Sequence, residues 1–395
     1  MQNCNMDFII HPSNLHGTVT PPPSKSQAHR AILAQALSSN PGRIDNLSPS
    51  QDIEATLRCV DALRTQAHSL PLLDCGESGS TLRFLIPVAL ALCHGARFTG
   101  HGRLMERPQK PYFDIFDEKG ILFRFEDGVL TIRGALPAGT YRLPGNVSSQ
   151  FVTGLLYALP LIAGDSEILM TSALESRDYV TMTLDMLEKF NIQVENHNYS
   201  RFSIPGGQRY CSRDLRIEAD WSQAAFWYAA RALGHSLEVD GMNPVSAQGD
   251  RVIEAQYQML SRPGECTIDV SGCPDLVPPL AAIASFRQST THLTNAARLR
   301  LKESDRLSAV REELCKLGVP VDETPDSLTI HGIQRLQSTQ LDSHNDHRIV
   351  MMAAILATRA SGPVTLRGAE SVAKSYPSFW DDYKRLGGKF EEVTG

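Results

Sequence analysis

A helical pattern recurs along the whole chain. Each instance has a turn rich in Gly, Pro or Ser, then a polar start and a run of small apolar residues, which predicts helices buried on all sides. The instances begin near Lys25, Gly79, Val147, Trp221, Asp275 and His347. The six instances form two sets of three, and a shorter gap opens each set. The pattern therefore predicts two similar domains of three repeats each, divided between Ile204 and Asp220.

Other elements follow from shorter patterns between these helices. Alternating apolar and polar residues, with turn residues such as Asp127–Gly128, predict β-hairpins over 121–133, 193–204 and 319–330. Amphipathic surface helices are predicted over 50–63, 176–190 and 304–317. Each repeat then has the order strand, helix, strand, strand, helix, strand. The predicted fold class is mixed α/β (α+β), with helices covering sheets.

Composition and charge exclude several classes of protein. The chain has 395 residues, enough for two or three domains, and a formal net charge of −6. This charge argues against broad electrostatic binding of nucleic acid or an anionic membrane. The longest apolar run, 84–93, is too short to span a bilayer. Eight cysteines without zinc spacing and an N-terminus without a basic leader predict reduced thiols in a cytoplasmic protein.

The starts of the buried helices are candidate anion sites. A buried helix end has little water to satisfy its first N–H groups and carries a partial positive charge, so several such ends together suit a phosphate. The first three starts carry Lys25, Ser26 and Arg30, then Gly79, then Ser148, Ser149 and Gln150. Helix capping is the simpler explanation for a single Ser. Lys25 points more strongly to a ligand, because a cation in a first turn opposes the helix dipole unless an anion lies nearby.

The C-terminal half has three charged clusters at predicted element boundaries, 302–306, 345–348 and 373–375. Taken singly, such runs are usually solvated surfaces. Together they place Arg and Lys beside Asp and Glu, as a phosphate site with proton-transferring carboxylates requires. The chain contains no GxSxG, HExxH or Walker A motif, which disfavours a hydrolase or a nucleotide-binding protein of those types.

These motifs, taken in order, make the chain similar to the 5-enolpyruvylshikimate-3-phosphate synthases, a family of carboxyvinyl transferases of the shikimate pathway. The resemblance rests on PPPSKSQAHR (21–30), GESGSTLRF (76–84), ERP (106–108), GNVSSQF (145–151), LESRDY (174–179), PD (274–275), LKESDRL (301–307), NDHR (345–348) and AKSYP (373–377). It implies an inverse α/β barrel-like fold of two similar domains, each of three βαββαβ units, with the ligand cleft between them. One domain is expected over 17–218, and 1–16 with 219–395 are expected to form the other.

The resemblance also implies which residues bind the two substrates. For shikimate 3-phosphate they are Lys25, Ser26, Arg30, Ser148, Ser149, Gln150, Ser176, Asp275 and Lys302, with Tyr179 packing nearby. For phosphoenolpyruvate they are Lys25, Gly79, Arg107, Gln150, Arg306, Arg348 and Lys374. Phosphoenolpyruvate carries a carboxylate and a phosphate close together, which explains the need for several Arg and Lys side chains.

The implied reaction adds the 5-hydroxyl of shikimate 3-phosphate to C2 of phosphoenolpyruvate, forms a tetrahedral intermediate and expels phosphate. Asp275 would take the hydroxyl proton, while Glu303 or Lys25 would deliver a proton to the methylene carbon. No metal or organic cofactor is required, glyphosate is expected to inhibit, and the chain is expected to act as a monomer. Two residues depart from the family pattern, Glu77 and Arg298, and both stay outside the assigned sites.

Two alternatives remain beside this interpretation. A UDP-N-acetylglucosamine enolpyruvyl transferase would share the fold and the phosphoenolpyruvate chemistry, but it typically uses a loop cysteine, and 101–108 contains none. Ser148–Ser149–Gln150 also favours the shikimate-type enzyme. A phosphate- or nucleic-acid-binding protein similar to the RNA-end cyclases is disfavoured by the net charge and by Asp275 and Glu303.

Overall fold

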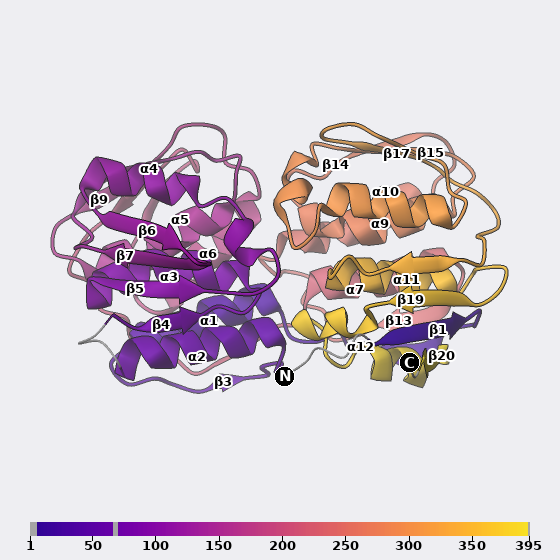
Figure 1. Cartoon of the computed structure of the whole chain (residues 1–395), viewed down its shortest axis with the longest axis horizontal. Coiled ribbons are helices and arrows are strands. Elements are labelled where there is room, and N and C mark those ends of the chain that lie inside the picture. The colour runs from indigo at the N-terminus through magenta and orange to yellow at the C-terminus, as the bar shows by residue number, and fades with distance from the viewer. Residues whose placement is uncertain (1–5, 66–69, 394–395) are drawn as a thin grey trace. The chain divides into compact units, whose positions relative to one another are not determined.

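Two structural units share the chain in an interleaved order. A computed structural model describes residues 6–65 and 70–393, and Pro23–Ile217 form one unit of it, here the N-terminal unit (Figure 1). The residues up to Pro22 and those from Glu218 onward form the C-terminal unit. The prediction of two domains is therefore confirmed. Its first boundary, at 16/17, is wrong because strand β2 (His16–Val19) pairs with β13 (Ser236–Val239) of the C-terminal unit, and the second lies one residue earlier than expected.

The N-terminal unit contains two four-stranded sheets in the orders β4-β5-β7-β6 and β10-β11-β9-β8, and one parallel pair, β12-β3. Its elements are α1 (Lys25–Leu37), β3 (Ile44–Asp45), α2 (Gln51–Thr65), β4 (Leu72–Asp74), α3 (Gly79–Cys93), β5 (Gly95–Thr99), η1 (Leu104–Glu106), α4 (Lys110–Lys119), β6 (Leu122–Glu126), β7 (Val129–Arg133), β8 (Gly139–Leu143), α5 (Ser149–Ala158), η2 (Leu159–Leu161), β9 (Ser166–Met170), α6 (Arg177–Lys189), β10 (Glu195–His197), β11 (Arg201–Ile204) and β12 (Leu215–Arg216).

The C-terminal unit repeats this plan, with sheets β14-β15-β17-β16 and β18-β19-β1-β20 and the parallel pair β13-β2. Its further elements are β1 (Asp7–His11), α7 (Trp221–Ala232), η3 (Gly249–Val252), α8 (Ile253–Leu260), β14 (Cys266–Asp269), η4 (Pro274–Leu276), α9 (Val277–Ser285), β15 (Thr290–Thr294), η5 (Ala297–Leu301), α10 (Arg306–Lys316), β16 (Val321–Glu323), β17 (Leu328–His331), β18 (Gln340–Asp342), α11 (His347–Ala357), β19 (Val364–Arg367), η6 (Ala369–Lys374), α12 (Phe379–Arg385) and β20 (Lys389–Val393).

The order of elements within a repeat differs from the expected βαββαβ. Each four-stranded sheet begins with two parallel strands, such as β4 and β5, and a parallel pair needs a crossover helix between its strands. A second helix then leads to an antiparallel hairpin, which gives βαβαββ. In the last sheet the N-terminal strand β1 takes the place of one hairpin strand, between β19 and β20. Within the described residues the sheets stay open and do not close into a barrel.

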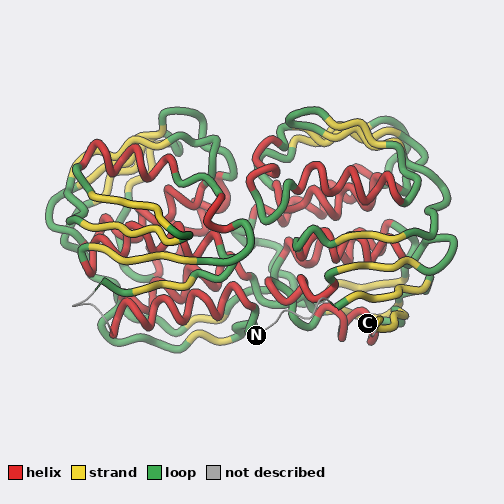
Figure 2. Tube along the Cα trace, in the orientation of Figure 1, coloured by secondary structure: helices red, strands yellow, loops and turns green. Residues whose placement is uncertain are grey.

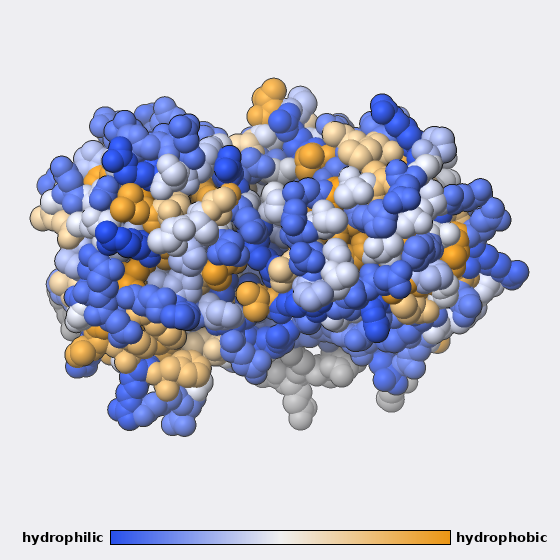
Figure 3. Space-filling model, turned by 90° about the horizontal axis from the view of Figure 1, so that it is seen from above, coloured by the Kyte–Doolittle hydropathy of each residue, from blue (hydrophilic) through white to orange (hydrophobic). Residues whose placement is uncertain are grey.

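The predicted helices are central, and the sheets cover them. In the C-terminal unit α7, α9 and α11 lie between the two four-stranded sheets (Figures 1 and 2). All residues of α9 and α11 are buried, as their small apolar composition predicts. The face in Figure 3 is mainly hydrophilic, with hydrophobic residues scattered over it. The core of each unit is thus a layer of helices whose polar starts still need partners.

The boundaries of the predicted elements are close to those observed. Helices α1, α3, α7 and α11 begin at the predicted residues, and the three hairpins form as β6–β7, β10–β11 and β16–β17. Helix α9 begins two residues later than predicted, because 274–276 form a 3-10 turn around Pro274. The short helices α4, α8 and α12 were not predicted, since none has a long apolar period.

Two findings bear on the expected cellular setting. None of the helices in residues 6–65 and 70–393 has both the length and the apolar character that crossing a bilayer requires. In the same part of the chain no cysteine belongs to a disulfide.

A buried histidine holds the N-terminal segment to the C-terminal unit. Nδ1 of His235 accepts a hydrogen bond from the backbone N–H of Leu15 (3.1 Å), and Nε2 lies 2.8 Å from the hydroxyl of Thr358. Because Nδ1 accepts, the neutral imidazole is the form that fits. Burial and the nearby Arg359 lower the pKa of His235 to about 4.

Acidification should loosen this attachment. The unfolded chain takes up a proton at an ordinary histidine pKa of 6.5, whereas the folded chain does so only near 4, so stability is lost as the pH falls through this window. In urea unfolding at pH 7 and pH 5, we expect His235→Gln to lose about 1 kcal/mol at pH 7 but to depend less on pH than the wild type. His331→Gln, on the exposed side of β17, should keep the wild-type pH dependence. Equal pH dependence in all three proteins would contradict the assignment.

Candidate active site

Three helix starts of the C-terminal unit meet at Arg348. This residue is the second of α11, Ser222 is the second of α7, and Asp275 lies in η4 directly before α9. Nη2 of Arg348 donates to Oδ2 of Asp275 and to the hydroxyl of Ser222, each at 3.1 Å. The three buried helix starts are therefore held around one guanidinium and one carboxylate.

The carboxylate of Asp275 is surrounded by cations. Besides Arg348, Nζ of Lys302 lies 3.2 Å and Nη1 of Arg306 lies 2.9 Å from its Oδ1. The side chain keeps an exposed fraction of 16%, so it is nearly buried and still reachable from outside. Cations at these distances favour the ionised carboxylate, which is the form that can accept a proton. The structure thus brings together the predicted residues Asp275, Lys302, Arg306 and Arg348.

Arg306 is the buried centre of this cluster. Its Nε donates to Asp346 (2.8 Å) and its Nη2 to Glu303 (2.6 Å), and its side chain is 1% exposed. Burial alone would lower the pKa of Arg306, but the carboxylates of Asp346, Glu303 and Asp275 raise it above its ordinary value. Asp346 also caps α11, because its Oδ1 accepts the backbone N–H of Arg348. The guanidinium therefore stays charged and fixed in orientation.

Lys374, at the end of η6, is joined to the same cluster through the backbone. Its Nζ donates to the carbonyl oxygen of Asn345 (2.6 Å), the residue before Asp346. The cluster then has four cations, Lys302, Arg306, Arg348 and Lys374, and three carboxylates, Asp275, Glu303 and Asp346. Because these groups are buried or nearly so, the extra positive charge favours an anionic ligand.

In the N-terminal unit, a guanidinium lies against the start of α3. A Cβ placed on Gly79 would stand 2.6 Å from Nη1 and 2.9 Å from Cζ of Arg107, closer than atoms can approach. Glycine at this position is what lets Arg107 pack on the backbone at the positive end of the helix. The structure thus brings together two residues that were predicted separately.

Gln150 links the starts of α5 and α3. Its amide Nε2 donates to the hydroxyl of Ser80 (3.0 Å), and its Oε1 accepts from Arg83 (2.8 Å). Arg83 is an ordinary surface residue by its sequence context, but the structure buries it to 3% exposure. Ser148 caps α5 by accepting the backbone N–H of Gln150, so its capping role is real, and Ser149 is the first residue of the helix. Gln150 is therefore fixed from both sides of its amide.

The start of α1 is held by two further partners. Nζ of Lys25 lies 2.6 Å from Asp52 of α2, so the anion that a cation in a first turn needs is supplied by the protein itself. The buried Arg30 donates to the carbonyl oxygens of Ser26 and Tyr179 and to the hydroxyl of Thr183. Burial lowers the pKa of Arg30 to about 10. These bonds join α1 to α6.

Thr183 extends the connection to α5, because its hydroxyl also lies 3.0 Å from that of Thr153. Ser176 directly precedes α6 and adopts a left-handed backbone conformation (φ 52°) with its side chain buried. The predicted residues Ser26, Arg30 and Ser176 are thus attached to one network of α1, α5 and α6.

Comparison with known proteins decides the family. The profile of the EPSP synthase (3-phosphoshikimate 1-carboxyvinyltransferase) family matches residues 9–383. The chain belongs to the EPSP synthase family. It is 46% identical to the 3-phosphoshikimate 1-carboxyvinyltransferase of Clostridium kluyveri, with 97% of this chain and 98% of that protein covered. It is 44% identical to the enzyme of the same name from Clostridium acetobutylicum over similar shares, 97% and 98%.

Solved structures agree with this membership. The EPSP synthase from Acinetobacter baumannii superposes with a TM-score of 0.79 at 25% identity, covering 98% of this chain and 100% of that one. The enolpyruvyl transferase NikO from Streptomyces tendae gives a TM-score of 0.77 at 17% identity, with 99% of each chain covered, and shows a shared fold. The EPSP synthase resemblance of the sequence motifs is thereby confirmed.

Glu77 and Arg298, the two residues that depart from the family pattern, each contact a loop residue nearby. The Glu77 carboxylate lies against Gly102, where a Cβ would stand 2.6 Å from its Oε2, so Glu77 packs on the loop that leads to Arg107. Arg298 donates to the carbonyl oxygen of Ser271.

Four residues of this candidate site were left unassigned by sequence reasoning, namely Asp52, Arg83, Ser222 and Asp346. Three of them make their site contacts to residues 27 to 126 positions away, for Lys25, Gln150 and Arg348 respectively. No local pattern reports such contacts. Asp346 had a readable signal, since an Asp directly before the buried helix at His347 is a typical helix cap.

Proposed function

We propose that the chain transfers the carboxyvinyl group of phosphoenolpyruvate to the 5-hydroxyl of shikimate 3-phosphate and releases phosphate, with Asp275 as the base. The observation that carries this proposal is the position of the Asp275 carboxylate among Lys302, Arg306 and Arg348. A carboxylate in such surroundings can take a hydroxyl proton while the cations hold the anionic groups of both substrates.

The resemblance to the family divides the proposed binding residues between the two substrates. Arg107 at Gly79, together with Lys25, Gln150, Arg306, Arg348 and Lys374, would bind the carboxylate and phosphate of phosphoenolpyruvate. Ser26, Arg30, Ser148, Ser149, Ser176, Asp275 and Lys302 would bind shikimate 3-phosphate, with Lys25 and Gln150 shared between the substrates. The excess of one positive charge in the C-terminal cluster supports this assignment, because it favours an anionic ligand. The ligand cleft expected from the sequence stays a prediction.

The two candidates for proton transfer at the methylene carbon differ in protonation. An ammonium group such as Lys25, beside Asp52, carries the proton that must be delivered to C3 when the 5-hydroxyl adds to C2. Glu303 is held by Arg306 at 2.6 Å, which favours its ionised form. We therefore assign proton delivery to Lys25, and to Glu303 the removal of a proton from the resulting methyl group as phosphate leaves.

The remaining expectations belong to the same proposal. The reaction needs no metal or organic cofactor, since the described side chains can supply each proton and each countercharge. The absence of disulfides in the described part of the chain supports a cytoplasmic location. A monomer suffices, because all proposed residues come from one chain.

Phosphate release from the purified protein tests the function directly. Release should require shikimate 3-phosphate and phosphoenolpyruvate together, and mass spectrometry should show a product that carries the carboxyvinyl group. Phosphate release from phosphoenolpyruvate alone would contradict the proposed transferase activity and indicate a phosphatase. UDP-N-acetylglucosamine as the preferred acceptor would favour the related transferase instead.

Replacing the base should separate catalysis from binding. Asp275→Asn keeps the shape of the side chain but removes its proton acceptor, so we expect turnover to fall by about 10²-fold or more while KM for shikimate 3-phosphate stays within about tenfold. Asp269→Asn, at the end of β14, serves as the matched control and should keep wild-type turnover. Turnover near the wild-type value in Asp275→Asn would remove Asp275 from the proposed role.

Glyphosate, which carries a carboxylate and a phosphonate, should compete with phosphoenolpyruvate for the same cations. A methyl group at Gly79 would displace the guanidinium of Arg107, so Gly79→Ala should raise both the KM for phosphoenolpyruvate and the inhibition constant of glyphosate by about tenfold. The control is Gly362→Ala, whose added methyl would meet only Ser338 within 4 Å. Competition of glyphosate with shikimate 3-phosphate instead, or unchanged constants in Gly79→Ala, would refute the placement of Arg107.

A further inference from the structure

A short loop of unusual backbone conformation leads into the site. It spans Asp342 to Asp346, between the end of β18 and the start of α11. His344 and Asn345 both have positive φ values, 50° and 53°, a conformation that is uncommon for residues other than glycine, although Asn and His adopt it more often than most. Such a loop needs external contacts to keep its conformation.

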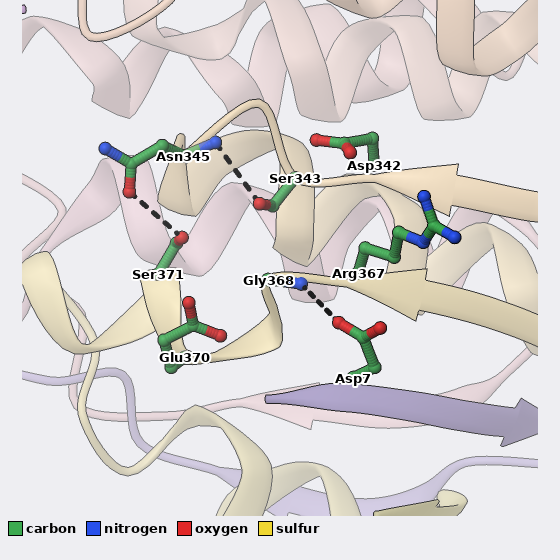
Figure 4. A pocket seen from close by; sticks show the side chains of 8 residues that line it. All are labelled: Asp7, Asp342, Ser343, Asn345, Arg367, Gly368, Glu370 and Ser371. Carbon is green, nitrogen blue, oxygen red and sulfur yellow. Dashed lines mark hydrogen bonds between the residues drawn. The ribbon is translucent and has the colours of Figure 1, made fainter. Parts of the chain in front are cut away.

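The loop delivers two groups to the site. The carbonyl oxygen of Asn345 accepts a hydrogen bond from Lys374. The side-chain oxygen of Asn345 lies 3.5 Å from the hydroxyl of Ser371, so η6 is held at two points. The carboxylate of Asp346 holds Arg306. Figure 4 shows Asn345 between Ser343 and Ser371, beside a polar cavity of about 580 Å³. The positions of Lys374 and Arg306 therefore depend on the loop.

Helix α10 holds the loop at both of its ends. Arg306 in its first turn binds Asp346, and Glu313, two turns later on the same face, binds the beginning of the loop. Oε2 of Glu313 accepts the backbone N–H of Asp342 (3.0 Å), and Oε1 lies 2.6 Å from Nε2 of His344. Glu313 has no exposed surface, and the proposed function does not use it.

A carboxylate is the group these contacts require. Oε1 of Glu313 also accepts from Lys316 (2.7 Å), so its two oxygens face three donors, two of which can be charged. The hydrogen bond that His344 donates to Glu313, against the opposing effect of burial, raises the pKa of His344. An amide could satisfy only one side, since its NH₂ group would face either Asp342 or His344 and Lys316.

We infer that Glu313 is a positioning residue for phosphoenolpyruvate binding, acting through the Asp342–Asp346 loop on Lys374 and Arg306. The inference rests on the proposed function, because that function gives these two cations their ligand. Glu313 itself is expected to touch neither substrate.

The test compares two neighbouring glutamates in steady-state kinetics. Glu313→Gln should raise KM for phosphoenolpyruvate about fivefold or more and leave KM for shikimate 3-phosphate within about twofold, because Lys374 and Arg306 are assigned to the first substrate. Glu312→Gln is the matched control. Its carboxylate lies 3.8 Å from His344 and is half exposed, so both KM values should stay at the wild-type level.

A merely structural role of Glu313 gives a different result. Loss of folded protein lowers the apparent turnover and leaves both KM values unchanged, and that outcome would overturn the inference. His344→Asn provides a second test if Glu313→Gln does not fold. The substitution removes the imidazole, and Asn tolerates the positive φ of this position. It should raise KM for phosphoenolpyruvate in the same direction, and an unchanged value would overturn the inference as well. A wild-type protein that does not join the two substrates would contradict the proposed function itself. That result is obtained without the variants, so it is distinguishable from a failure of the inference about Glu313.

Discussion

The buried ion pair of Arg306 and Asp346 is the interaction on which the rest of the C-terminal site depends. A charge buried without a partner costs several kcal/mol, so each of these residues requires the other. Asp346 also caps α11, and Arg306 also orients Asp275 and Glu303. One pair therefore fixes the start of a helix, the proposed base and a second carboxylate.

The N-terminal unit meets the same physical requirement with different groups. Its buried helix starts are capped by the hydroxyls of Ser24, Ser78 and Ser148, each of which accepts a backbone N–H of the first turn, and Asp52 pairs with the cation of Lys25. In both units the small apolar residues that bury the helices also remove water from their first turns. Polar side chains must then gather at these ends, which makes the helix layer a binding surface as well as a core.

The sequence predicted the repeating helices well, because each is long, apolar and opened by a turn. The predicted order of elements within a repeat was wrong, because hydrophobic periodicity does not show how strands are connected. Helix α4 (Lys110–Lys119) is amphipathic but only 10 residues long, and without it the crossover between parallel strands and the hairpin that follows cannot be told apart. The first domain boundary was missed because strand β2 has four residues and is defined by its partner β13, more than two hundred positions away.

In the candidate site too, local patterns were readable from the sequence and long-range contacts were not. Arg306 and Arg348 lie within recognisable motifs and were assigned from the sequence, whereas Ser222, which holds Arg348, lies in no such motif. Lys25 shows the difference most clearly. A cation in a first helical turn needs an anion, but Asp52 satisfies that need in the folded chain. The argument from one helix therefore predicts a negative neighbour, and only the packing of α1 on α2 shows that this neighbour includes a residue of the protein. The case for an anionic ligand rests instead on the charge excess around Asp275, which no single helix reveals.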